Sequence, residues 1–120
     1  MKRTPMRRKP RRRPTMTPEQ YEVVMLRARG RCEAQIAPDC HRRPEVWHHR
    51  QSRAVGDHSA PNGLAVCDPC HRHIHAHPEE SRDLGLIVSR HSPNPGDVFV
   101  RMWDGWWILT DGGSRVEVEA

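Results

Sequence analysis

The sequence has no long hydrophobic run. No stretch of its 120 residues approaches the roughly 20 apolar residues that a membrane-spanning helix needs. Residues 1–13 are basic, but no apolar stretch follows them, which argues against a secretory signal peptide. There is no internal repeat either. We therefore expect a soluble, cytoplasmic protein whose cysteines are reduced.

Acidic residues are absent from residues 1–14, which hold eight of the 20 lysines and arginines. The remaining chain has 12 basic and 15 acidic residues, so the net charge of +5 comes from this segment. Three prolines interrupt the segment and methionine is its only apolar residue type, so we expect residues 1–16 to form a disordered tail. Such a tail binds polyanions or serves solubility and localisation. The candidate nucleic-acid contacts in it are Arg7, Arg8, Arg11, Arg12 and Arg13.

A chain of 120 residues can bury only a modest hydrophobic core, so additional stabilisation is expected. The four cysteines could supply it through a metal ion or disulfides. Cys67-Asp68-Pro69-Cys70 has the C-x-x-C spacing of a zinc knuckle, and Cys32 and Cys40 form a second pair. Seven residues separate that second pair, more than is usual, so His41 is an alternative ligand. A redox pair or disulfides are the competing interpretations. No thioredoxin-like βαβ pattern surrounds the motif, so we expect a structural zinc ion.

The first predicted element is a helix that begins at Thr17-Pro18-Glu19-Gln20, which has the pattern of a capping box. Gly30 suits the cap at the other end of this helix. Four apolar residues between these caps have helical spacing and predict one core-facing side: Tyr21, Val24, Met25 and Ala28.

The second half of the chain predicts short elements. Residues 79–84 favour a helix and residues 86–88 a strand. The C-terminal part predicts a β-meander with strands at residues 98–103, 106–110 and 115–119 and turns at Asp104-Gly105 and Asp111-Gly112-Gly113. Trp103 and Trp106 would then face each other. Together with Trp107 they would pack against the meander or anchor a larger enzyme.

Val46-Trp47-His48-His49-Arg50 contains two adjacent histidines. Neighbouring residues of a strand point to opposite faces, so the two imidazoles would have different roles. On a helix that begins near Pro69 and ends before Pro78, His71 and His75 would lie one turn apart and could share a metal ion. Four of the remaining histidines are left as unassigned polar surface: His41, His73, His77 and His91. His58 is expected at the surface, and the alternative is that it contacts substrate or a metal ion, because it lies close to the paired histidines in the sequence.

This arrangement resembles the HNH family of metal-dependent nucleases, whose ββα-metal site is a hairpin packed on a helix. The resemblance covers residues 31–77 and is carried by His48-His49, Asn62, His71 and His75, framed by the four cysteines. In the nuclease domains of the DNase colicins, the middle asparagine likewise stands nine residues before a metal-binding histidine, with another histidine four residues later.

The resemblance implies a role for each of these residues. His48 and His71 correspond to metal ligands, with His75 as a third, and His49 corresponds to the general base. Asn62 would hydrogen-bond across the hairpin and hold the loop of the base. A neutral imidazole can deprotonate water near neutral pH, and a divalent cation such as Mg²⁺, Mn²⁺, Ni²⁺ or Zn²⁺ would act as the Lewis acid.

The fold so implied is α+β. It has a nuclease domain at residues 17–92, stapled by a four-cysteine zinc site and including the N-terminal helix, and a β-meander at residues 93–120. The expected activity is that of a DNA endonuclease, with Arg50 or Arg53 on a phosphate. The free-standing bacteriophage proteins of this family can act beside the terminase in DNA packaging. The alternatives are a non-catalytic zinc module that binds DNA and a scaffold for a larger DNA enzyme.

Overall fold

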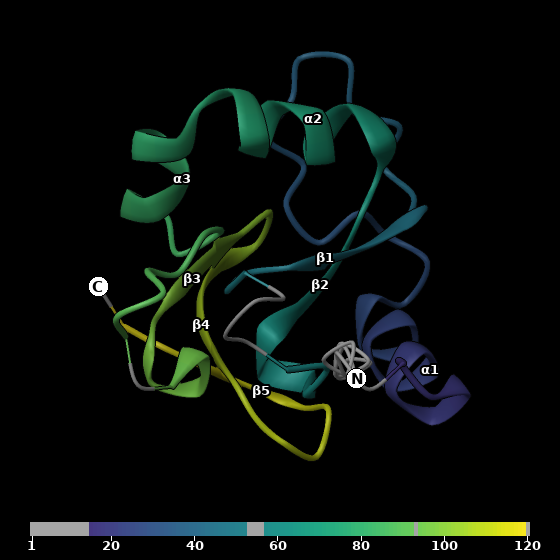
Figure 1. Cartoon of the computed structure of the whole chain (residues 1–120). Helices are drawn as coiled ribbons and strands as arrows, with labels where there is room; N and C mark the ends of the chain where they lie inside the picture. The colour runs from purple at the N-terminus through teal and green to yellow at the C-terminus, as the bar shows by residue number, and fades with distance from the viewer. Residues whose placement is uncertain (1–14, 53–56, 93, 120) are drawn as a thin grey trace, which may run out of the picture.

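A two-stranded antiparallel hairpin forms the centre of the protein (Figure 1). The computed structural model describes residues 15–52, 57–92 and 94–119. Its elements are, in order, α1 (Pro18–Ala28), β1 (Val46–His49), η1 (Ala60–Asn62), β2 (Gly63–Val66), α2 (Asp68–Ala76), α3 (Pro78–Asp83), η2 (Pro95–Asp97), β3 (Val100–Met102), β4 (Gly105–Leu109) and β5 (Arg115–Glu117).

Side-chain alternation along the hairpin gives it two covered faces. Leu64 and Val66 of β2 pack in one hydrophobic cluster with Ile74 of α2. Trp47 and Ala65 belong to a second cluster with residues of α1. The hairpin therefore lies between the two helices, and all four residues of β2 are buried.

Helix α1 begins where the capping box predicts it. The Gln20 N–H donates to Thr17 Oγ1 (3.2 Å), and the Thr17 N–H donates to Gln20 Oε1 (2.9 Å). Val24 and Ala28 are buried as predicted, but Tyr21 is 47% exposed, so its assignment to the core-facing side was wrong. Tyr21 lies in the first turn, where it lines a surface groove beside Met16 instead of the hairpin.

Helix α2 begins at Asp68 and ends at Ala76, in agreement with the predicted stop before Pro78. His77 has φ −127° and ψ 67°, outside the helical region, and Pro78 then begins α3. The predicted strand at residues 86–88 is wrong, because only Val88 forms a bridge there, with Gln51. The chain turns sharply just before it, at Gly85 (φ 71°), where a Cβ atom would lie 1.9 Å from the carbonyl oxygen of Phe99.

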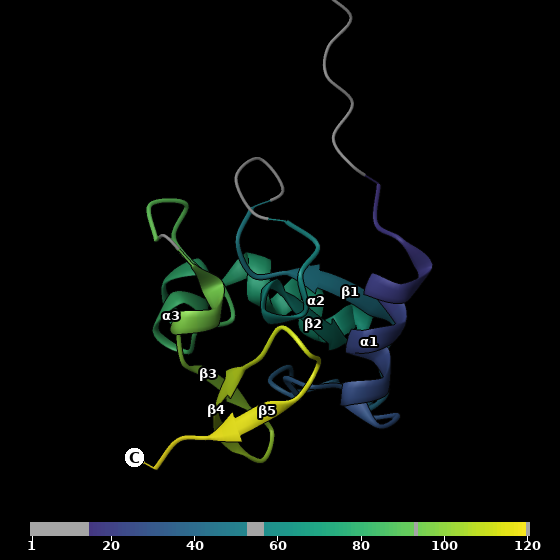
Figure 2. The ribbon, with the colours of Figure 1, turned by 90° about the horizontal axis from the view of Figure 1, so that it is seen from below.

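The C-terminal strands form the predicted meander in the order β3-β4-β5, separate from the hairpin (Figure 2). The predicted first turn is displaced by one residue, because Met102 pairs with Gly105 and Trp103 and Asp104 form the turn. Trp106 consequently pairs with Arg101, so the predicted contact between Trp103 and Trp106 was wrong. A slip of one residue moves every side chain of a strand to the other face.

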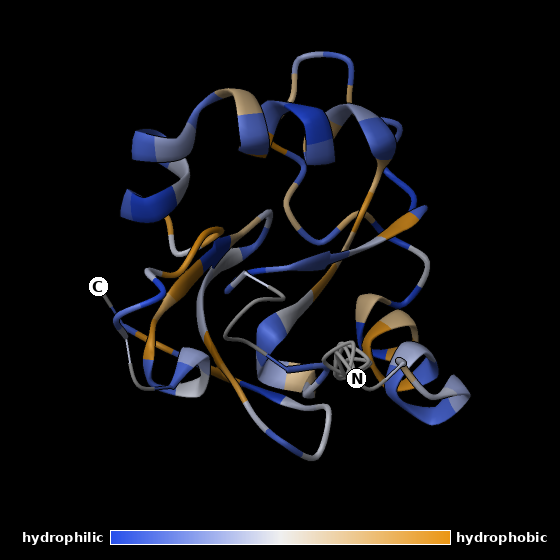
Figure 3. Cartoon of the chain, viewed as in Figure 1, coloured by the Kyte–Doolittle hydropathy of each residue, from blue (hydrophilic) through white to orange (hydrophobic). Residues whose placement is uncertain are grey.

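The meander shares the main core with the rest of the chain. Val100, Met102 and Leu109 belong to the same buried cluster as Leu64 and Ile74. Figure 3 shows hydrophobic segments along β2 and in the meander, whereas α2 and α3 are mostly hydrophilic. The fold is a small α+β arrangement of three helices and two antiparallel sheets within the described ranges. None of the helices there is long and apolar enough to cross a membrane.

A buried ion pair connects α1 to the hairpin. Arg27 and Glu33, each with 2% of the side chain exposed, form two hydrogen bonds of 2.9 Å. Arg27 also donates to the carbonyl oxygens of Ala60 and Gly63, while the Ala65 N–H donates to Glu33 Oε1. Because its polar atoms have these additional partners, the desolvation cost of this pair is offset by hydrogen bonds.

Candidate metal centre and histidine cleft

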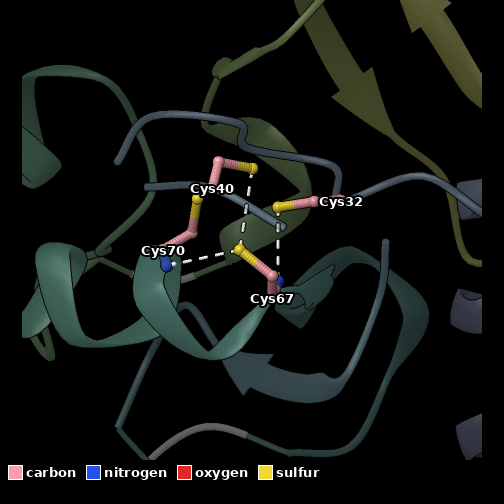
Figure 4. A group of neighbouring side chains, drawn as sticks. All are labelled: Cys32, Cys40, Cys67 and Cys70. Atoms are coloured by element: carbon pink, nitrogen blue, oxygen red, sulfur yellow. Dashed lines mark hydrogen bonds between the residues drawn. The ribbon is translucent and has the colours of Figure 1, made fainter. Parts of the chain in front are cut away.

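The four cysteines converge on one point (Figure 4). Their sulfur atoms all lie within 4.8 Å of one another, and none of them forms a disulfide. Cys67 is the N-cap residue of α2, and Cys70 lies in the first turn of that helix. Cys32, Cys67 and Cys70 are buried and Cys40 is half-buried. Four cysteine sulfurs at this spacing form a site that can hold a structural metal ion such as zinc.

Backbone N–H groups point at the sulfurs of this cluster. The N–H of Gln35 approaches Cys32 Sγ (3.4 Å) and the N–H of Cys70 approaches Cys67 Sγ (3.4 Å), so each pair contributes a knuckle with the same spacing of three residues. Gln35 has a left-handed backbone conformation (φ 48°) that permits this tight turn. N–H donors stabilise the charge of thiolates, so this arrangement suits cysteines that bind a cation.

The long spacing between Cys32 and Cys40 does not prevent Cys40 from joining the cluster. The alternative ligand, His41, turns its ring to Glu45, with Nδ1 at 2.7 Å from Oε1. The backbone N–H of His41, by contrast, points at Cys67 Sγ (3.4 Å). The four donor atoms gathered at this site are therefore all cysteine sulfurs.

Burial and hydrogen bonds shift the pKa values of three of these thiols, those of Cys32, Cys67 and Cys70. Desolvation raises the pKa of Cys32 to about 11 and also raises that of Cys70. Burial opposes ionisation of Cys67 too, but hydrogen bonds from the backbone of Cys70 and His41 outweigh it and lower its pKa. A cation that binds here must therefore displace protons, which makes binding dependent on pH.

Three histidines converge at a second point. His48 of β1 faces His71 and His75 of α2, with ring centroids 5.2 and 5.4 Å away, and one nitrogen from each ring lies within 4.8 Å of the others. The predicted spacing of one helical turn places His71 Nε2 3.1 Å from His75 Nε2. Three imidazoles fit a divalent cation that keeps open positions for water or substrate.

The buried ring of His48 has a defined orientation. Its Nε2 lies 2.8 Å from the carbonyl oxygen of Leu86, so this nitrogen carries the proton and Nδ1 keeps a lone pair. Burial lowers the pKa of His48 to about 3, and burial likewise lowers the pKa of His71, with His75 adding to the effect. A neutral imidazole oriented by a carbonyl is the usual form of a histidine that binds metal.

His49 lies on the opposite face of β1, as the alternation of a strand requires. Its ring packs against Trp47, with centroids 4.5 Å apart, and its Nε2 is 2.9 Å from Nδ1 of His58. His58, expected at the surface, is half-buried, with its ring against that of His49.

One cleft of about 600 Å³ borders both faces of β1. His48 and His49 both line it although their rings point in opposite directions, so the cleft runs past the edge of β1 that does not pair with β2. Among the described residues, those that line the cleft are Trp47, His48, His49, Arg50, Ser52, His71, His75 and Ile87.

Asn62 is buried at the base of the loop that joins β1 to β2. Its Oδ1 accepts from the Gln51 N–H (2.7 Å), and its Nδ2 donates to the carbonyl oxygen of Asp57 (2.7 Å). Its own carbonyl oxygen accepts from the Arg50 N–H (2.8 Å). Asn62 thus connects both ends of the loop and holds them next to His49.

Arg50 does not have the predicted position of a phosphate contact. Its side chain is buried (1% exposed), and its guanidinium donates to the carbonyl oxygens of Pro61, Gly85, Pro95 and Val98 at 2.8–3.0 Å. Burial, with a smaller contribution from Arg27, lowers the pKa of Arg50 to about 10. Arg50 therefore supports the loops around the cleft instead of facing a ligand.

The other arginines predicted to contact DNA lie outside the described residues. They are Arg7, Arg8, Arg11, Arg12, Arg13 and Arg53. The histidines without a predicted role lie away from the cleft: His73 stacks on His77 with centroids 4.1 Å apart, and His91 is exposed.

No protein-family model matches the sequence, and no curated protein or solved structure matches it either.

Proposed function

We propose that the protein is a metal-dependent HNH-type endonuclease that hydrolyses phosphodiester bonds of DNA. The observation that carries the proposal is that histidines on the two opposite faces of β1 line one cleft. On one face, the nitrogens of His48, His71 and His75 lie within 4.8 Å of one another, and on the other face His49 lines the same cleft. A metal-dependent hydrolase that uses a side chain as base needs the metal site and the base near each other, with the base outside the coordination sphere.

In this proposal, the side chains around the cleft have separate roles in hydrolysis. His48, His71 and His75 would hold a divalent cation such as Mg²⁺, Mn²⁺, Ni²⁺ or Zn²⁺, which when bound supplies Lewis acidity at the phosphate. His49 takes a proton from the attacking water with a neutral ring nitrogen. Asn62 fixes the loop beside His49 through Gln51 and Asp57.

The histidine cluster also favours an enzyme over a non-catalytic zinc module. The four-cysteine site alone would be enough to staple the fold. A separate cluster of three histidines is not needed to stabilise the fold in this way. One of these histidines, His48, is only 1% exposed and is oriented by the carbonyl oxygen of Leu86. We infer DNA as the substrate from the basic tail at residues 1–14 together with the family resemblance. Action beside a phage terminase belongs to the same proposal and is supported by the resemblance.

Cleavage of supercoiled plasmid tests the proposal. The full chain is incubated with plasmid and Mg²⁺, Mn²⁺, Ni²⁺ or Zn²⁺, beside His49→Ala and a matched control, His91→Ala, which changes an exposed histidine away from the cleft. Wild type and His91→Ala should nick or linearise the plasmid, and His49→Ala should bind DNA and lose about 10²- to 10⁴-fold in rate. Equal cleavage by His49→Ala would remove its role as base. Binding without cleavage by wild type under all metals would favour the zinc module or scaffold.

A further inference from the structure

His58 forms a pair with His49, which lines the cleft. Nδ1 of His58 lies 2.9 Å from Nε2 of His49, within hydrogen-bonding distance, and the ring centroids are 5.1 Å apart at an interplanar angle of 64°. Trp47 packs against both rings, with centroids 4.5 Å from His49 and 6.3 Å from His58. The two imidazoles and the indole therefore form one connected group.

The backbone around His58 is fixed by the hairpin. The carbonyl oxygen of Asp57 accepts from Asn62 Nδ2 (2.7 Å), and the carbonyl oxygen of Ser59 accepts from the Asn62 N–H (3.0 Å). The Ser59 N–H also donates to Asp57 Oδ1 (3.1 Å). Since Asn62 holds both neighbours of His58, the position of His58 is set by the same residue that holds the loop of the base.

A hydrogen bond between two neutral imidazoles contains one proton, so one ring donates and the other accepts. The proton between Nε2 of His49 and Nδ1 of His58 therefore determines which nitrogen of His49 retains its lone pair. It also restricts rotation of the His49 ring. A hydrogen-bond partner at one ring nitrogen favours one tautomer and one orientation of an imidazole over the others.

We propose that His58 is a positioning residue for His49: it selects the tautomer and the ring orientation in which His49 acts as base. This inference rests on the proposed nuclease function. His58 itself forms no bond to substrate in this role. The assignment gives a histidine a third role in the proposed chemistry, after metal binding and general-base catalysis.

Two variants of His58 separate positioning from packing. In His58→Asn, an amide oxygen or nitrogen can occupy the place of Nδ1 and pair with His49, whereas His58→Phe keeps a ring but has no hydrogen-bonding atom. Steady-state plasmid cleavage should show a kcat for His58→Phe that is about 10- to 100-fold lower, with KM unchanged, as for other groups that orient a functional imidazole. His58→Asn should retain most of the wild-type kcat.

The second measurement does not depend on cleavage. Long-range ¹H–¹⁵N correlation spectra of the full chain report the tautomer of His49. In wild type and His58→Asn, its two ring nitrogens should have distinct shifts, one protonated and one not, and in His58→Phe the shifts should move toward each other. Unchanged shifts, or an unchanged kcat, in His58→Phe would overturn the proposal. If wild type does not cut DNA, the nuclease function fails, while the spectra still decide whether His58 fixes the His49 ring.

Discussion

His48 and His49 are neighbours in β1 whose rings are held from opposite sides by different segments. The carbonyl oxygen of Leu86 lies 2.8 Å from Nε2 of His48, and Nδ1 of His58 lies 2.9 Å from Nε2 of His49. Adjacent imidazoles with separate partners can serve a metal ion and a water molecule without competing for either. The cleft therefore contains two histidine side chains from adjacent positions that are available for different roles.

The sulfur cluster predicts that Cys40, and not His41, is needed for metal binding. Purified protein should contain one tightly bound zinc ion at this site. Cys40→Ser should lose the zinc ion and should no longer show a cooperative unfolding transition, because a structural zinc ion contributes directly to folding. His41→Ala should keep the metal, since the ring of His41 faces Glu45. Elemental analysis and thermal denaturation provide the measurements. Retention of the metal by Cys40→Ser and its loss from His41→Ala would reverse this ligand assignment.

Arg50 should be essential for stability. Arg50→Leu removes the donors of four backbone carbonyl oxygens in a buried region and should lower the free energy of unfolding by about 3 kcal/mol or more. Arg90→Leu, at an exposed position, serves as the matched control and should change it by less than about 0.5 kcal/mol. Urea denaturation measures both. If Arg50→Leu is as stable as wild type but binds DNA more weakly, the result would instead support Arg50 as a phosphate contact.

Local patterns account for the parts of this fold that could be predicted. The capping box at Thr17, the knuckle at Cys67 and Cys70, and the helical spacing of His71 and His75 each depend on residues within one or two turns. The displaced turn at Trp103 shows the limit of such patterns. Asp104-Gly105 is a strong turn signal, yet the strand pairing uses Gly105 as the partner of Met102.

The roles of Arg50 and His58 depend on contacts that no local pattern contains. Arg50 binds carbonyl oxygens that lie 11 to 48 residues further along the chain, and a carbonyl oxygen is present at every residue whatever its side chain. A buried arginine therefore looks like an exposed one in the sequence. His58 pairs with His49 across the loop that follows β1, and Asn62 holds the backbone next to His58. The nine-residue interval between the two histidines carries no periodic signal for this contact.

The ion pair between Asp104 and Arg115 predicts a dependence of stability on pH. Hydrogen bonds from Arg115 at 2.6 and 2.7 Å hold the pKa of Asp104 below its ordinary value of 3.8. The folded state therefore binds a proton less readily than the unfolded state, so this contribution is complete above pH 3.8 and is lost as the pH falls through the lowered pKa. Its size should be about 1 kcal/mol or less, because the pair is partly exposed. Stability measured against pH for wild type and Asp104→Asn should converge in acid; parallel curves would contradict this linkage.

Gly63 should control the position of His49 through Trp47. A Cβ atom at Gly63 would lie 2.2 Å from the Trp47 ring, and that ring packs against His49 at 4.5 Å. Gly63→Ala should therefore displace the indole, lower the free energy of unfolding by about 1–3 kcal/mol and reduce plasmid cleavage under conditions where the variant remains folded. Gly112→Ala is the control, because a Cβ atom there meets no atom within 4 Å. Full cleavage by a folded Gly63→Ala variant would mean that the position of His49 in the cleft does not depend on Trp47.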